Sequence, residues 1–171
     1  IGWLAVLFVC LGIEAFARPL KPTLIGGVEV DPAAWKPVVN ITVGNSGCTA
    51  TVVGPRVILS AGHCATTGSI ATFTAAGKNY RAKMTRSALY PTPGLDISLG
   101  ITTEDIAGVT PISIGGTPTT GKEIVLLGYG CTTVDGTGFD GKLRMGRALV
   151  TDVEELRFNS SNGGGALLCP G

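Results

Sequence analysis

A single histidine lies in a short polar interruption between apolar segments of the chain. His63 is the only histidine among the 171 residues, and it belongs to residues 59–64, with the sequence LSAGHC. An imidazole is the side chain best suited to take and return a proton near neutral pH. A lone histidine is more often structural or solvent-exposed, so the assignment of chemistry to His63 depends on the residues around it.

An aspartate further along the chain could orient this imidazole. Asp96 lies in residues 95–99, with the sequence LDISL, directly before an apolar run. A carboxylate there can accept a hydrogen bond from the imidazole, set its tautomer and stabilise the imidazolium. The alternative is an aspartate that caps a turn before a strand, because Asp is a common turn residue. The order His then Asp, with an apolar strand after each, favours the catalytic role.

Together these two segments resemble blocks of the chymotrypsin-like (trypsin family) serine proteases. Residues 59–64 are similar to the family's (L/V)-T-A-A-H-C block, in which Gly62 replaces a common alanine by another small residue. Residues 95–99 are similar to the family's D-I-(A/S)-L block, which holds a buried aspartate. The resemblance implies that His63 is the general base and that Asp96 is the acid that orients it.

The cysteines agree with this resemblance. Cys48 lies fifteen residues before the histidine and Cys64 follows it directly; in the family such a pair bridges the loop around the histidine, which fixes the imidazole. The four cysteines that remain after the signal allow three connectivities. Cys131 and Cys169 can pair with each other or with cysteines further along the protein, and the resemblance favours pairing with cysteines further along. With one histidine and no CxxC pair, we expect no metal site. The interval between the two blocks is shorter than in the animal digestive enzymes of the family, so we expect no calcium loop, and we expect no cofactor.

The last residues resemble the start of another family block. Residues 167–171, LLCPG, are similar to the opening of the C-x-G-D-S-G-G-P signature. The resemblance implies that the backbone N–H of Gly171 belongs to the oxyanion hole, and that the nucleophilic serine lies two positions beyond it. Leu167 would then lie at the floor of the specificity pocket and favour apolar or small side chains over basic ones. The alternative is a loop with a chance Cys-Pro-Gly turn. On this interpretation the 171 residues alone are inactive.

A further segment resembles the start of the mature enzymes. Residues 24–27, LIGG, are similar to the family's I-V-G-G. The resemblance implies a zymogen in which cleavage frees the α-amine of Leu24, although an ordinary strand before a Gly-Gly turn gives the same pattern. Thr23 precedes the cut where trypsin would need Arg or Lys. Another protease, or autolysis, would therefore activate the enzyme.

The beginning of the chain has the pattern of an export signal. Residues 1–13 are almost all apolar, and residues 15–17, AFA, fit the small-x-small rule for signal peptidase. The apolar run is too short for an ordinary membrane span, and the alternative is a buried core segment. We expect residues 1–17 to be a signal peptide without its true start, 18–23 to be a short propeptide or linker, and 24–171 to be a protease domain truncated at its C-terminus.

The rest of the chain predicts an all-β fold. Apolar and β-branched runs alternate with Gly and Pro turns, as in residues 49–53 and 57–59 around Gly54-Pro55, and no long amphipathic helix is present. Residues 124–127 have the composition of a buried strand. The resemblance implies two antiparallel Greek-key β-barrels, the second incomplete, with the active site between them.

The resemblance implies a serine endopeptidase that acts on protein or peptide substrates as a monomer, and with the export-signal pattern we expect a secreted precursor, extracellular or periplasmic. The formal net charge is +1, so nothing predicts binding to nucleic acid, or to a membrane once the signal is removed. Two alternatives stay open: an inactive homologue that acts as a binding module, and a secreted β-rich interaction domain with chance matches. Glycosylation sequons begin at Asn40 and Asn159.

Overall fold

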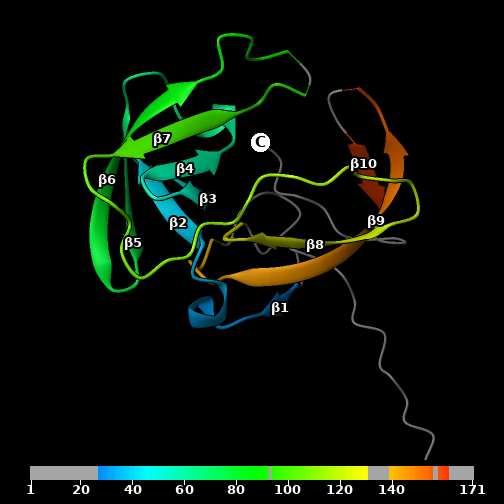
Figure 1. The fold of residues 1–171 in the computed structure, drawn as a ribbon, viewed down its shortest axis with the longest axis horizontal. Coiled ribbons are helices and arrows are strands. Elements are labelled where there is room, and N and C mark those ends of the chain that lie inside the picture. Colours follow the sequence, from blue (N-terminus) through cyan, green and yellow to red (C-terminus); the bar gives the residue numbers. More distant parts are fainter. Residues whose placement is uncertain (1–26, 93, 131–138, 156–157, 162–171) are drawn as a thin grey trace, which may run out of the picture.

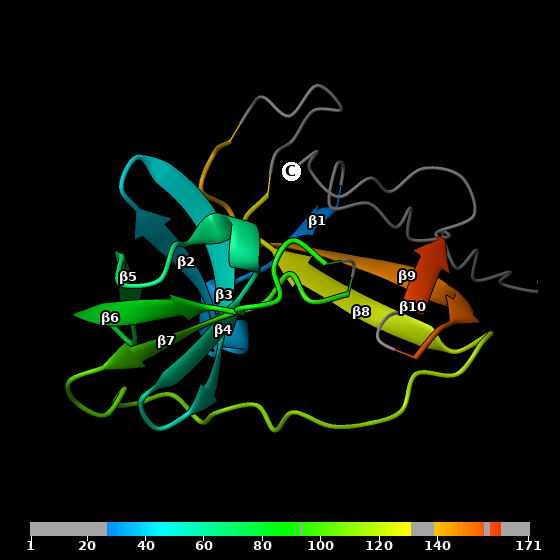
Figure 2. The ribbon, with the colours of Figure 1, turned by 90° about the horizontal axis from the view of Figure 1, so that it is seen from above.

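The computed structural model describes residues 27–92, 94–130, 139–155 and 158–161, and within them it has one closed barrel and one open sheet (Figures 1 and 2). The barrel contains six antiparallel strands in the order β2-β3-β4-β7-β6-β5. Their bounds are β2 Val38–Val43, β3 Ser46–Gly54, β4 Val57–Ser60, β5 Ile70–Ala75, β6 Lys78–Arg86 and β7 Ser98–Thr102. The all-β class and the first barrel are thereby confirmed.

The barrel closes around a continuous apolar core. Its strands alternate between inward and outward side chains, most regularly in β5, β6 and β7, because successive residues of a strand point to opposite faces. The inward side chains pack into one cluster that includes Ile41, Val52, Ile58 and Met84. Gly100 of β7 also faces inward, where a Cβ atom would lie 2.6 Å from the sulfur of Met84. The glycine therefore lets β7 approach the core closely.

The connection after β4 brings the histidine to one end of the barrel. β4 pairs with β7 instead of with β5, and β5 closes the barrel against β2, which is a Greek-key arrangement. The chain leaves β4 through a short 3₁₀ turn, η2 Gly62–Cys64. Because Ser60 at the end of β4 pairs with Ser98 at the start of β7, the residues just beyond these two strand ends lie side by side.

The second half of the described chain forms a four-stranded sheet. It contains β1 Val28–Glu29, β8 Glu123–Gly128, β9 Arg144–Val153 and β10 Phe158–Ser161, and a short 3₁₀ turn, η1 Pro32–Trp35, follows β1. β9 is the central strand and pairs with the other three. The sheet lies beside the barrel in both views (Figures 1 and 2). The apolar run at residues 124–127 predicted a buried strand; β8 forms there, but Val125 is exposed and Ile124, Leu126 and Leu127 are only partly buried.

A small apolar cluster joins the two halves. It contains Val38, Tyr129 and Leu143, with Trp35 packed against it. The backbone N–H of Tyr129 donates a hydrogen bond to the hydroxyl of Thr49 in β3, at 2.8 Å. The Gly128-Tyr129-Gly130 segment thus packs against the barrel, beside the strand that carries Cys48. In the described part of the chain, no helix has the length and apolar character needed to cross a bilayer.

Candidate active site

The site lies where the ends of β4 and β7 meet, and its first member is the histidine of η2. His63 belongs to the loop of residues 61–65 that follows β4, here called the histidine loop. Its side chain is 48% exposed, so one side of the imidazole is open to solvent. The hydroxyl of Ser98 donates to the carbonyl of Ala61 at 2.8 Å, and it ties this loop to β7.

Asp96 approaches the histidine at two points. Its Oδ2 lies 2.6 Å from Nδ1 of the imidazole, and its Oδ1 accepts the backbone N–H of His63 at 2.7 Å. An ionised carboxylate can only accept hydrogen bonds, so the proton of the neutral imidazole is on Nδ1. The Nε2 lone pair is then free to accept a proton. This is the geometry in which an imidazole can act as a general base.

The environment keeps Asp96 ionised. Its partial burial raises the pKa, but the hydrogen bonds from the His63 ring, and from the backbone N–H groups of His63 and Gly62, together outweigh this effect. The pKa of Asp96 therefore lies below its ordinary value of 3.8. The resemblance implied a buried aspartate, whereas the side chain is 44% exposed.

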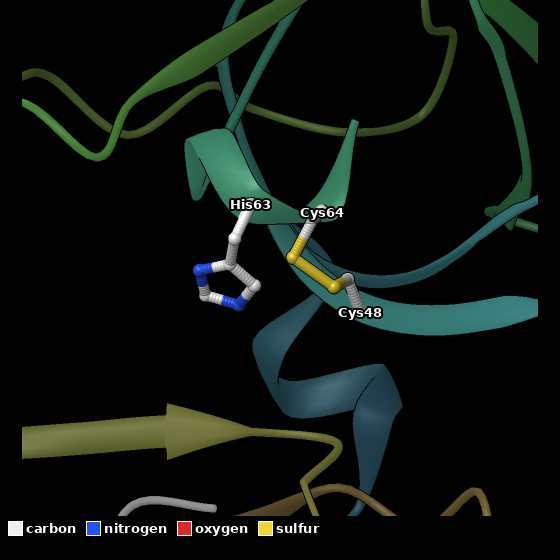
Figure 3. Close-up of side chains that lie close together, drawn as sticks. All are labelled: Cys48, His63 and Cys64. Atoms are coloured by element: carbon white, nitrogen blue, oxygen red, sulfur yellow. A yellow bond between two sulfur atoms is a disulfide. The ribbon is translucent and has the colours of Figure 1, made fainter. Parts of the chain in front are cut away.

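A disulfide holds the histidine loop from the other side. Cys64 is bonded to Cys48 of β3, with Cα atoms 6.2 Å apart, as the resemblance implied. Figure 3 shows the imidazole of His63 beside this bond. The loop is thus attached to β3 through the disulfide, to β7 through Ser98, and to the residue Asp96 just before β7. Since β3 and β7 both belong to the closed barrel, the position of the imidazole depends on the barrel as a whole.

Gly62 lies in the tightest part of the loop. A Cβ atom there would be 2.9 Å from Oδ1 of Asp96 and 3.0 Å from the backbone nitrogen of Ile97. The replacement of the family's alanine by Gly62 therefore gives the carboxylate space next to the backbone. In the sequence, Gly62 is an exchange of one small residue for another, and the close approach was not predicted.

One contributor to the site was not predicted. Ser98 is 1% exposed and holds the histidine loop through its hydroxyl. Its signal in the sequence was a small polar residue at an inward position of a strand. The other predicted site residues, which are Leu24, Leu167 and Gly171, lie outside the described residues, as do Cys131 and Cys169.

The donor atoms of Cys48, His63 and Cys64 lie within 4.8 Å of one another. This is the one cluster of three potential metal donors of the His, Cys, Asp and Glu types in the described part of the chain. Both sulfur atoms belong to the disulfide, and a cystine sulfur is not the thiolate that binds zinc. In the disulfide state the cluster therefore serves to fix the histidine loop.

The barrel, the disulfide and the His63–Asp96 pair together define the chymotrypsin-like fold class. A family model described as Trypsin matches residues 24–170, and the chain belongs to this family. No curated protein sequence matches the chain significantly.

Among the solved structures that resemble the fold are two chains with similar TM-scores. One is neuropsin, a serine protease expressed in the limbic system of mouse brain, with a TM-score of 0.61 and 18% identity over 74% of this chain and 64% of that one. The other is GrC, with a TM-score of 0.61 and 20% identity over 74% of this chain and 65% of that one. The matches span less than two thirds of either structure. At these identities they show the fold alone.

Proposed function

We propose that this protein is a secreted serine endopeptidase that hydrolyses peptide bonds through a Ser-His-Asp triad and an acyl-enzyme. The observation that carries the proposal is the two-point contact of Asp96 with His63, at Nδ1 and at the backbone N–H. This contact holds the ring in the tautomer that leaves Nε2 as the proton acceptor. Membership of the trypsin family supports the same reaction.

In the proposed reaction, His63 takes the proton of the serine hydroxyl at Nε2 while the serine oxygen attacks the peptide carbonyl. The imidazolium is stabilised by the carboxylate of Asp96, and it gives the proton to the leaving amine. Water then hydrolyses the acyl-enzyme by the same sequence of proton transfers. The mechanism is the one established for this family's triad, and the serine is the residue expected two positions after Gly171. The N–H of Gly171 would stabilise the oxyanion.

The remaining expectations extend this proposal. A disulfide that fixes the catalytic loop favours an oxidising compartment, which supports secretion. Activation by a cut before Leu24, and a pocket that disfavours basic side chains because of Leu167, follow from the resemblance alone. Residues 1–171 alone should hydrolyse no peptides by this mechanism, because the nucleophile is expected after Gly171.

The test is a hydrolysis assay on the protein extended beyond Gly171, with peptide amides as substrates. We expect Asp96→Asn to lower kcat by about 10⁴-fold, a magnitude that comes from the triad of this same family. His63→Ala should lower it at least as much. Asp105→Asn, which makes the same change at an exposed aspartate of the same half, should have no effect.

Two outcomes would overturn the proposal. One is hydrolysis that persists in the His63→Ala protein. The other is a residue other than serine two positions after Gly171, which would make the protein a binding module with a protease fold. Residues 1–171 that cleave casein faster than their His63→Ala variant would contradict the expected inactivity of this part of the protein.

A further inference from the structure

Three residues of metal-binding types, two cysteines and a histidine, meet at the histidine loop. The ligand atoms of Cys48, His63 and Cys64 lie within 4.8 Å of one another, and Figure 3 shows the imidazole next to the two sulfur atoms. Zinc binds cysteine sulfur at about 2.3 Å and histidine nitrogen at about 2.0 Å. A tetrahedral ion would therefore separate these donors by about 3.5–3.8 Å. The two sulfur atoms are bonded to each other in the disulfide, so they must separate on reduction to reach this spacing, whereas the imidazole already lies within 4.8 Å of both.

We propose that Cys48, Cys64 and His63 form a Zn²⁺ site whenever the two cysteines are thiols. Every chain passes through this state, because cysteines are synthesised as thiols and are oxidised later, on export. The site would have two thiolate ligands and one imidazole ligand, with the fourth position open to water. Binding releases the two thiol protons and changes no oxidation state.

The surroundings of His63 suit a metal ligand. Asp96 holds Nδ1 at 2.6 Å and fixes the ring, so that Nε2 is the nitrogen free to bind the ion. A carboxylate that accepts the second ring N–H is the usual partner of a zinc-bound histidine. The His63 side chain is about half exposed, which leaves a path for the ion, and both cysteines are partly buried. Two thiolates balance the charge of the zinc ion.

The same atoms would then have two exclusive uses. Zinc on Nε2 occupies the lone pair that the proposed mechanism needs, so the dithiol form of the protease would be held inactive. A disulfide oxidant such as oxidised glutathione would reverse this: with two protons, it converts the zinc dithiolate into the Cys48–Cys64 disulfide, two glutathione thiols and free Zn²⁺. Only this consequence depends on the proposed function. Zinc binding can be measured without hydrolysis.

The experiment uses residues 1–171 with Ser in place of the other cysteines, which are Cys10, Cys131 and Cys169. A phosphine reduces the disulfide with two electrons; it gains an oxygen atom from water, whose two protons go to the thiols. After anaerobic removal of the phosphine, the chain is titrated with Zn²⁺ against a chromophoric chelator. A second titration with Co²⁺ reports thiolate ligands through their charge-transfer bands.

We expect one zinc ion per reduced chain and none per oxidised chain. Asp96→Asn should weaken binding by about 10–100-fold, as expected for the partner of a ligating histidine. His63→Ala should weaken it by more, and Asp105→Asn not at all. Equal zinc affinity in the His63→Ala chain would overturn the proposal, because the two thiols would then bind alone. A reduced chain that binds no zinc, whether it is folded or unfolded, would also overturn the proposed zinc site. Neither of these two outcomes bears on the proposed hydrolysis.

Discussion

The closed barrel and the open sheet differ in how they bury apolar side chains. Strands β2–β7 enclose one continuous core, with Ile41, Val52 and Ile58 fully buried. The described part of the sheet has a smaller cluster, at the joint between the halves, and one member of that cluster, Val38, belongs to a barrel strand. The barrel has its own core, whereas the described sheet depends in part on the barrel.

This difference bears on the site, because both members of the His63–Asp96 pair belong to the barrel. The disulfide, the Ser98 hydrogen bond and the carboxylate all attach the histidine loop to barrel strands or to residues next to them. The base and its acid are thus held by the half with the larger core. A functional site that is placed on rigid elements keeps its geometry better than a site placed on loops alone.

The largest expected effect tests this comparison with one substitution in each half. Val52→Ala removes methyl groups from a side chain that is 0% exposed in β3, and Val125→Ala removes the same groups from one that is 44% exposed in β8. We expect Val52→Ala to lower the free energy of unfolding by about 2–3 kcal/mol, from lost transfer energy and a residual cavity. Val125→Ala should cost less than about 1 kcal/mol. Urea unfolding of both variants measures the difference, and equal costs would show that Val125 is covered as completely as Val52.

A second prediction concerns the contact between the barrel end and the histidine loop. Gly62→Ala places a Cβ atom 2.9 Å from Oδ1 of Asp96 and 3.0 Å from the backbone of Ile97. Because something must shift, we expect a cost of about 1–2 kcal/mol in the free energy of unfolding. The displaced carboxylate should also change the Nδ1 proton resonance of His63, which can be assigned directly because the chain has no other histidine.

Gly115→Ala is the matched control for this substitution. Gly115 is exposed, and a Cβ atom there would meet nothing within 4 Å. The Gly115→Ala substitution should change neither the free energy of unfolding nor the His63 resonance by a measurable amount. A Gly62→Ala protein that matched this control in both measurements would show that the loop has room for a larger residue, as the family's usual alanine suggests.

The sequence predicted the elements whose signals are local. The hairpin of β3 and β4 follows from β-branched runs around Gly54-Pro55, and it is confirmed. Residues 38–43 were not predicted as a strand, and in the structure Val38 and Val39 are both buried, so the burial of β2 does not alternate at its start. Val38 packs in the joint between the halves and Val39 in the barrel core. Both faces of β2 are therefore covered near its start, which only the arrangement of the two halves explains.

The same limit holds for the site. Single blocks of sequence identified His63 and Asp96 and placed Cys48 near the histidine. The hydrogen bond from Ser98 to Ala61, and the close approach at Gly62, depend on the register between β4 and β7, which brings Ser60 opposite Ser98. Register is set by packing between strands that are distant in sequence. The exposure of Asp96 likewise depends on which residues cover it.

The smallest expected effect concerns the charge of Asp96. Its pKa is lower in the folded protein than its ordinary value of 3.8, so the ionised carboxylate stabilises the fold. This contribution is fully present above about pH 4 and is lost as the pH falls through the lowered pKa of the folded state. It should be no more than about 1 kcal/mol, because both side chains of the pair are almost half exposed and solvent screens them.

The prediction is tested by urea unfolding of the wild-type and Asp96→Asn proteins at several pH values. The asparagine cannot ionise, so the stability advantage of the wild type over Asp96→Asn should shrink as the solution is acidified from about pH 6 to about pH 2. Asp105→Asn provides the control for removal of an exposed carboxylate. An advantage that stayed constant over this range would mean that the carboxylate contributes through hydrogen bonds alone. The closed barrel would then hold the histidine loop without help from the charge of Asp96.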